Sequence, residues 1–337
     1  MNISNLLKNF AQKRKTPLQL KFLYNYNKKK TKKNLVEQSK FLYNELSIRL
    51  SHRVFDLMKL PYGIPSIPEI KNVIHLYSES FQRIQLSKMP NNFEDIEHFT
   101  NLLENIKYRH NNLENNIAQG ISIINNPLID YSLIDNELNR FFISRIGIRT
   151  LISQQIETIK HNKNIFSKCN LKNIVINSID NVNYLSEFTL ENTPNIKINC
   201  KDDINLLYIE NHLEYIITEI LKNAYVAHDK FDSNEYIQID VSEGKSDIII
   251  KISDKGGGFK FNDIENTLSF SYTTNKVDFS KIYKQTKIIS GYGFGLPMSK
   301  LYAQYFGGDL FINPIENIGT DVFIYINKLG HNSEKLY

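Results

Sequence analysis

The 337-residue sequence contains only two cysteines, Cys169 and Cys200, and no tryptophan. Two cysteines cannot build a disulfide framework, and their separation does not match that of paired metal ligands. This scarcity excludes the small disulfide-stapled secreted proteins and favours a reducing compartment, with both cysteines in structural positions.

Long apolar runs are also absent, because Asn, Lys or Glu interrupts the longest hydrophobic patches. A membrane-spanning helix needs about 20 predominantly apolar residues. The sequence therefore predicts no membrane span. The chain length predicts about two domains at roughly 150 residues each.

Acidic residues are missing before Glu37, although lysine and arginine are frequent there and the net charge of the chain is +5. Such a basic start is typical of an organelle-targeting segment, which we place at residues 1–15. A solvated basic arm or a patch for an acidic partner fits the same composition. Because the positive charge is confined to this terminal part, the sequence does not favour nucleic-acid binding.

Apolar residues recur every three to four positions from residue 35 to about 163, which predicts a helical bundle. The first helix begins near Leu35 and ends before a proline-containing stretch, 61–68. The other predicted helices span 69–88, 93–124 and 133–159. Few apolar residues occur in 162–170, which we interpret as a linker.

Alternating apolar residues appear in the second half and predict strands at 196–198, 236–241, 247–252 and 320–326. A helix is expected over 174–188, and another is expected to start at Asn211 with Glu214 three residues later. This mixture of elements after a bundle predicts an α+β protein. Its predicted parts are a bundle at 16–165, a second domain at 171–328 and a short tail at 329–337.

Two polar residues, Glu219 and Asn223, are four positions apart on the helix expected after residue 211, so they point the same way. An amide oxygen suits Mg²⁺, which takes its remaining oxygens from water and substrate phosphates. A carboxylate one turn away can accept a proton from an attacking hydroxyl. A solvated Glu and Asn on a surface helix is the alternative interpretation.

Two glycine-rich turns follow. Asp254 precedes Gly256 and Gly258 at a strand end, where a carboxylate can accept a hydrogen bond from an adenine amine, although Asp and Gly also make ordinary turns. Gly293 and Gly295 precede Leu296 and a helix, where backbone N–H groups can bind phosphate oxygens. The long segment between the turns, about 259–290, is a candidate lid.

Thr273 and Thr274 lie within this candidate lid and could donate to phosphates, or they could be ordinary loop threonines. The second glycine turn lacks the Lys-Ser/Thr pair of a P-loop and does not follow a strand as a dinucleotide-binding fingerprint does. Both of those nucleotide folds are therefore disfavoured.

The ordered set Glu219-x-x-x-Asn223, Asp254-x-Gly256-x-Gly258, Gly291-x-Gly293-x-Gly295 and Gly319-Thr320 resembles the ATP-binding superfamily of gyrase, Hsp90, histidine kinases and MutL. The longer strings around these residues, with Arg109-His-Asn111 and Ala118-Gln-Gly120 in the helical half, resemble the mitochondrial 2-oxoacid dehydrogenase kinases. The resemblance covers nearly the whole chain from Thr16. It implies a four-helix bundle followed by an α/β sandwich ATP-binding domain of the Bergerat type.

The resemblance implies a mitochondrial-matrix serine kinase that inactivates the decarboxylase component of a 2-oxoacid dehydrogenase complex, with ATP and Mg²⁺. It assigns Glu219 as general base, Asn223 as magnesium ligand, and Asp254 and Thr320 to the adenine pocket. On the phosphate side it places Thr273, Thr274, Gly293, Gly295 and Leu296. It also implies a homodimer and a contact with the lipoyl domain of the acyltransferase core, for which Leu20, Leu23 and Phe41 are candidates. These three residues could equally belong to the core of the bundle.

A potassium site near the lid is implied as well. Its matching positions are Thr267, Ser269, Tyr272 and Gly293, with Ser269 in place of a family carboxylate. The substrate could be of the branched-chain or the pyruvate type. Tyr215, the 146–148 segment and Phe294 favour the branched-chain type slightly, whereas Arg109-His-Asn111 and Ala118-Gln-Gly120 resemble the pyruvate kinases.

One departure from the family concerns Val226, which stands three residues after Asn223 where the family has arginine. Losing that positive charge should weaken nucleotide binding or transition-state stabilisation, unless Lys222, Lys230 or a lysine of the candidate lid compensates. A catalytically weak or inactive ATP-binding scaffold is therefore an alternative function. A histidine kinase is a further alternative, which would need an exposed histidine followed closely by an acid. In the helical half, Arg53 follows His52, Phe99 follows His98 and Asn111 follows His110, so none of these three suits the role.

Overall fold

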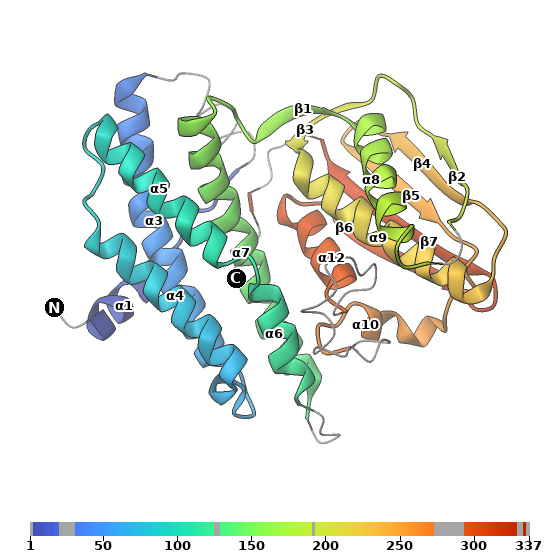
Figure 1. Cartoon of the computed structure of the whole chain (residues 1–337), viewed down its shortest axis with the longest axis horizontal. Helices are drawn as coiled ribbons and strands as arrows, with labels where there is room; N and C mark the ends of the chain where they lie inside the picture. Colours follow the sequence, from blue (N-terminus) through green and yellow to red (C-terminus); the bar gives the residue numbers. More distant parts are fainter. Residues whose placement is uncertain are drawn as a thin grey trace. The chain divides into compact units, whose positions relative to one another are not determined.

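The computed structural model describes residues 3–19, 31–124, 129–190, 193–272, 293–328 and 333–334. The chain forms two compact units, one of residues 1–165 with 334–337, and the other of residues 166–333. The first unit is helical and the second contains sheet and helices (Figure 1). The expected α+β organisation is confirmed.

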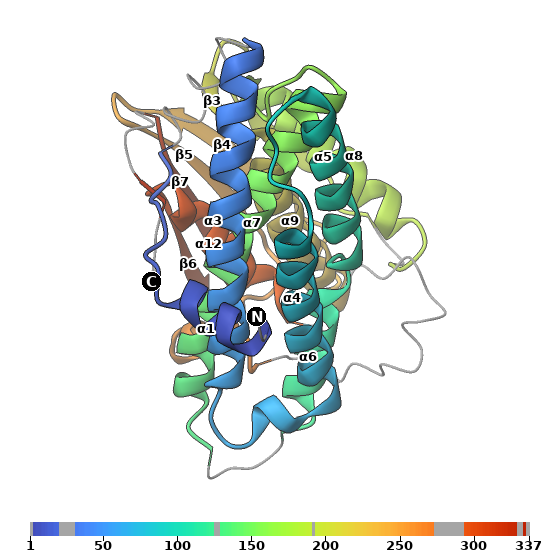
Figure 2. The ribbon, with the colours of Figure 1, turned by 90° about the vertical axis from the view of Figure 1, so that its left-hand side faces the viewer.

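The first unit is built on four long helices and completed by shorter ones. Its elements are α1 (Ile3–Ala11), α3 (Lys32–Met58), η1 (Ile64–Ser66), α4 (Pro68–Leu86), α5 (Phe93–Arg109), α6 (Leu113–Ser122) and α7 (Tyr131–Lys160). Helix α3 lies beside α4 (Figure 2). Three long helices begin at side chains that accept a backbone N–H, namely Thr31, Asn92 and Asp130.

The sequence predicted one helix over 93–124, which is wrong, because α5 ends at Arg109 and α6 begins at Leu113. A contact from a distant helix accompanies the break. Arg145 on α7 donates to the carbonyl oxygen of His110 at 3.1 Å. Asn111 and Asn112 follow, and asparagine competes with helical hydrogen bonds through its own side chain. Local periodicity cannot detect a break set by such a contact.

A buried ion network ties the end of the chain to the helical unit. Arg49 on α3 is fully buried, and its Nε lies 2.7 Å from Oε1 of Glu45. Its guanidinium also pairs with Glu334, where Nη1 donates to Oε2 at 3.1 Å. The Leu18 N–H donates to Glu334 Oε1 at 3.1 Å. Glu334 lies in the segment predicted to be a tail, but its side chain is buried.

The second unit contains two sheets. Its strands are β1 (Phe166–Asn170), β2 (Ile196–Asn199), β3 (Asn205–Ile209), β4 (Ile237–Glu243), β5 (Asp247–Ser253), β6 (Asp309–Ile315) and β7 (Gly319–Asn327). Strands β1 and β3 pair antiparallel. The other five form a sheet of order β2-β4-β5-β7-β6, in which only β2 and β4 run parallel.

Helices cover one face of the five-stranded sheet. They are α8 (Leu171–Ser186), α9 (Glu210–Phe231) and α12 (Gly295–Tyr305), and Figure 1 shows them on the same side of the strands. Alternate residues of β5, such as Ile248, Ile250 and Ile252, are buried, while their neighbours are half-buried. This alternation places a continuous apolar core between the sheet and the helices. Short elements η2 (Phe261–Asp263) and α10 (Ile264–Thr267) follow β5.

The four predicted strands are present, but β1, β3 and β6 were not predicted. The linker prediction for 162–170 is wrong at its end, because residues 166–170 form β1. Helix α9 begins at Glu210, directly after β3, with no side-chain cap. The predicted start at Asn211 is therefore wrong, because the strand continues into the helix and leaves no room for a capping turn. Within the described residues, no helix combines the length and apolar character of a membrane span.

Candidate active site

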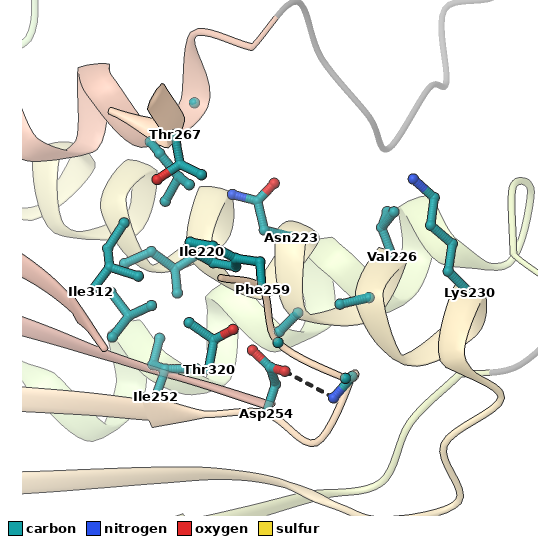
Figure 3. Close-up of a pocket in the computed structure, with 18 of the residues that line it drawn as sticks. Ile220, Asn223, Val226, Lys230, Ile252, Asp254, Phe259, Thr267, Ile312 and Thr320 are labelled. Atoms are coloured by element: carbon teal, nitrogen blue, oxygen red, sulfur yellow. Dashed lines mark hydrogen bonds between the residues drawn. The ribbon is translucent and has the colours of Figure 1, made fainter. Parts of the chain in front are cut away.

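A cavity of about 640 Å³ opens in the second unit between α9, the sheet, the loop after β5 and the start of α12 (Figure 3). Its size lies within the range typical of small-molecule sites. The sheet contributes apolar side chains such as Ile252, Ile312 and Val322, whereas α9 and the two glycine turns contribute polar groups. A flat apolar ligand part can therefore lie on the sheet while its polar parts face α9.

One side of α9 provides Glu219, Asn223, Val226 and Lys230 to the cavity. These positions recur at intervals of four, three and four residues, so they share one face of the helix. Buried residues on the opposite face, such as Leu213 and Leu221, fix the helix against the core. The apolar stripe thus sets the orientation of the polar one.

Glu219 is held in place by two neighbours. Its Oε1 accepts from Nζ of Lys222 at 2.9 Å, and both side chains are mostly buried, at 19% and 14% exposed. Its Oε2 lies against Gly295, so close that a β-carbon on that residue would stand 2.4 Å away. A carboxylate positioned in this way beside a glycine turn can receive a proton from a group bound in the cavity.

The contact between α9 and α12 is aromatic. The ring of His212 lies 4.7 Å from that of Tyr302, and the ring of Tyr215 lies 4.8 Å from Tyr302, measured between centroids. Burial lowers the pKa of His212 to about 3, so this imidazole is neutral. These rings pack the two helices together and so bring the start of α12 against Glu219.

Asp254 follows β5 and points into the cavity from the sheet side (Figure 3). Its Oδ1 accepts from the N–H of Gly256 at 2.9 Å, and its own N–H donates to the carbonyl of Thr320 at 2.9 Å. Burial raises the pKa of its carboxyl from the ordinary 3.8 to about 6. A buried carboxylate with an oxygen toward the cavity is a ready acceptor for an amine donor on a ligand.

The loop after Asp254 is packed onto the backbone of α9. A β-carbon on Gly256 would lie 2.5 Å from Cβ of Ala227 and 2.6 Å from its carbonyl carbon. The Lys255 N–H donates to Nε2 of His228 at 2.9 Å. Only a glycine allows this approach, which explains the position of the first glycine in the turn.

The second glycine turn leads into α12. Gly293 has φ +85°, which favours glycine, and Gly295 opens the helix. Gly293, Gly295 and Leu296 all line the cavity. The N–H groups of the first turn of a helix have no partners within the helix, and the dipole there is positive. This end of the cavity therefore suits phosphate oxygens.

The donor set fits Mg²⁺ bound together with a nucleotide. Asn223 offers one amide oxygen to the cavity, and magnesium is usually held by one or two protein oxygens with phosphates and water supplying the others. Among the described residues, no cluster of three or more His, Cys, Asp or Glu could hold a metal alone. The site is thus suited to a metal that arrives with phosphates.

The structure brings most of the sequence-predicted site residues together. Those that line the cavity are Glu219, Asn223, Asp254, Gly256, Gly258, Gly293, Gly295, Leu296 and Thr320, with Thr267 and Tyr272 of the potassium set. Ser269 is not among them, and its hydroxyl accepts from the Ser271 N–H at 3.0 Å. Thr273, Thr274, Leu20 and Leu23 lie outside the described residues, as does most of the predicted lid. Phe41 is half-buried on α3.

Some lining residues were not predicted as site residues, among them Phe259 and Asn317. Lys230, which the sequence offered as one of the lysines that could compensate for Val226, also lines the cavity, seven residues or two helical turns after Asn223 on the same face. Phe259 and Asn317 come from loops, and no local pattern marks their direction.

Comparisons with known proteins agree with this geometry. Residues 17–184 match the family model of mitochondrial branched-chain alpha-ketoacid dehydrogenase kinase. Residues 208–329 match that of histidine kinase-, DNA gyrase B- and HSP90-like ATPases.

Full-length relatives are similar along both units. A mitochondrial [pyruvate dehydrogenase (acetyl-transferring)] kinase of Arabidopsis thaliana is 32% identical over 344 residues, covering 96% of this chain and 93% of the relative. The corresponding kinase of Schizosaccharomyces pombe is 29% identical, covering 98% and 97%. Isozyme 1 of Homo sapiens is 29% identical, covering 89% and 75%.

Proposed function

We propose that this protein phosphorylates a serine of the decarboxylase component of a 2-oxoacid dehydrogenase complex, because the chain belongs to the mitochondrial 2-oxoacid dehydrogenase kinases. These kinases lie within the ATPase superfamily of histidine kinases, gyrase and HSP90. It is an ATP-dependent protein kinase of this family and, like its relatives, mitochondrial. The observation that supports the proposal best is the position of Glu219 between Lys222 and the glycine turn at Gly295.

In the proposed reaction, each of four parts of the cavity has a separate role. Asp254 accepts a hydrogen bond from the adenine amine, and the N–H groups at the start of α12 bind phosphate oxygens. Mg²⁺ held by Asn223 would neutralise charge on the phosphates. Glu219 accepts the serine hydroxyl proton as the serine oxygen bonds to the γ-phosphorus and the bond from that phosphorus to the bridging oxygen of ADP breaks.

The more specific part of the proposal is which 2-oxoacid dehydrogenase complex contains the substrate, the branched-chain or the pyruvate complex. Tyr215, the 146–148 segment, Phe294 and the name of the N-terminal family model favour the branched-chain complex. The full-length relatives are named pyruvate dehydrogenase kinases and favour the pyruvate complex. Both decarboxylases therefore belong in the test.

An ATP-binding scaffold is the second candidate, favoured by Val226 in the cavity wall, where the family resemblance implies arginine. A scaffold would bind nucleotide in the same cavity and lack transfer. The histidine-kinase alternative is less well supported, because the relatives over the full chain are kinases of another kind.

The test is transfer of labelled γ-phosphate from ATP to purified pyruvate and branched-chain decarboxylases, with lipoyl domain present. We expect acid-stable serine label on one of them. Glu219→Gln should abolish transfer while leaving ADP affinity within about threefold. Glu214→Gln is the matched control, because Glu214 lies on the same helix outside the cavity lining. Nucleotide binding without transfer by the unmodified protein would support the scaffold instead.

The partner and ion assignments also remain proposals. For the homodimer, support comes from the sheet face opposite the helices, where Phe311 is 52% exposed and its ring lies 5.4 Å from that of Tyr325. For the lipoyl domain, the half-buried Phe41 is the described candidate. For potassium, Thr267 and Tyr272 face the cavity, and backbone carbonyls would have to replace the missing carboxylate at Ser269.

A further inference from the structure

The described cavity wall has an unusual charge balance for a nucleotide site. Three carboxylates line it, from Glu219, Asp254 and Asp263, whereas Lys230 is the single lysine or arginine among the described lining residues. A nucleotide carries several negative charges close together, and such charge binds best to fixed cations and N–H donors. Lys230 is therefore the residue of the described wall most suited to a phosphate.

The position of Lys230 on α9 indicates which phosphate it can reach. It lies seven residues after Asn223, roughly 10 Å along the helix axis at about 1.5 Å per residue. Long side chains on a helix point back toward its N-terminus and cover the preceding turn. The ammonium group of Lys230 accordingly lies over the turn that contains Val226, and Figure 3 shows Asn223, Val226 and Lys230 on the same side of α9.

The two ends of the nucleotide are fixed by other groups. In the proposed function Asp254 binds the adenine and so marks the base end, and its loop packs on Ala227 of α9 through Gly256. Asn223 and the start of α12 lie at the end that suits the β- and γ-phosphates. A nucleotide bound in this direction would present its α-phosphate to the turn at Val226, whose side chain lines the cavity but offers no charge or hydrogen-bond donor.

We propose that Lys230 binds the α-phosphate of the bound adenine nucleotide and supplies the positive charge that Val226 lacks. This inference rests on the nucleotide site proposed above. It assigns a phosphate-binding cation to a position one helical turn beyond the one that the family resemblance implies. The same helix face holds the cation in either case, because positions 226 and 230 are four residues apart.

The test is the affinity for Mg-ADP and Mg-ATP, measured by titration calorimetry on the full chain. Lys230→Gln should weaken both nucleotides by about tenfold, the loss expected for one charge-assisted hydrogen bond. Lys230→Arg should stay within about threefold of the unmodified protein. Lys260→Gln is the matched control, because Lys260 is exposed, lies near the cavity in sequence and does not line it.

A second variant tests the inference by gain of affinity. Val226→Arg combined with Lys230→Gln places a cation on the same face, and it should recover most of the lost affinity. If Lys230→Gln binds both nucleotides as tightly as Lys260→Gln does, the inference is wrong. A loss seen with ATP alone would also refute it, since both nucleotides carry the α-phosphate. Failure of the unmodified protein to bind either nucleotide would instead overturn the proposed function.

Discussion

The close contact between Gly295 and Glu219 predicts that a substitution at Gly295 lowers the catalytic rate while leaving the fold intact. In Gly295→Ala the new β-carbon would stand 2.4 Å from Oε2 of Glu219, whereas ordinary van der Waals contact begins at 3.4 Å. Oε2 of Glu219 must therefore move by about 1 Å to make room for the new methyl group. The carboxylate is the flexible end of a side chain, and Gly295 does not have positive φ, so the backbone accepts alanine.

A displacement of about 1 Å in a reacting group typically costs on the order of 10²-fold in rate, or about 2.7 kcal/mol of transition-state stabilisation. We expect kcat to fall by about this factor in Gly295→Ala. The free energy of unfolding should change by less than about 1 kcal/mol, because alanine is also the better helix former. The measurements are phosphoryl transfer at saturating ATP and urea unfolding.

A double-mutant cycle with Glu219→Asp tests the cause. Aspartate is one methylene shorter, so its carboxylate avoids the new methyl group, and Gly295→Ala should cost much less in that background. A kcat for Gly295→Ala within threefold of the unmodified protein would refute the reasoning. An equal loss in both backgrounds would show that the methyl acts on the phosphate-binding turn and not on Glu219.

Two further predictions concern buried carboxylates. Asp254→Asn should raise the unfolding free energy of the nucleotide-free protein at pH 7 by about 3 kcal/mol, because the folded-state pKa of Asp254, about 6, lies above the ordinary 3.8, so its ionisation destabilises the folded state as pH rises between these values. The same substitution should weaken ADP binding. In urea titrations, a gain at pH 7 no larger than the gain at pH 4 would contradict this prediction. Glu334→Ala should destabilise the helical unit by about 3 kcal/mol, since it removes one of the two carboxylates that pair with the buried Arg49 guanidinium, which keeps Glu45 and the Thr16 carbonyl among its partners. The exposed Glu316→Ala should be neutral in urea unfolding followed by circular dichroism.

The sequence predicted the polar face of α9 that lines the cavity and both glycine turns because these features are local. Glu219 and Asn223 are related by helix period alone, and the buried stripe beside them fixes their direction. The glycine turns are marked by residue chemistry, as the packing of Gly256 on α9 illustrates. Sequence patterns within a single helix or turn were sufficient to predict these parts of the site, because all of their residues come from one element.

Features set by distant partners were missed. The break between α5 and α6 is accompanied by Arg145, which comes from another helix. Strand β6 contains Pro314, which argues against a strand, yet it lies at the sheet edge, where proline is tolerated. Strands β1 and β3 have the sequences Phe166-Ser-Lys-Cys-Asn170 and Asn205-Leu-Leu-Tyr-Ile209, which do not alternate strictly between apolar and polar residues. They also pair across a long insertion, so a local pattern does not identify them. Glu334 finds its partner 285 residues away.

In the proposed function, helix α9 sets the spacing of three groups that contact the nucleotide and the acceptor serine. Lys230, Asn223 and Glu219 lie on one face at separations of seven and four residues, or roughly 10 and 6 Å along the axis. In the proposed arrangement they meet the α-phosphate, the metal-bound phosphates and the acceptor serine in turn. Because one rigid helix carries all three, their spacing does not depend on loop conformation. Replacing Lys230 should therefore change nucleotide affinity and replacing Glu219 should change turnover, so the two roles can be measured separately.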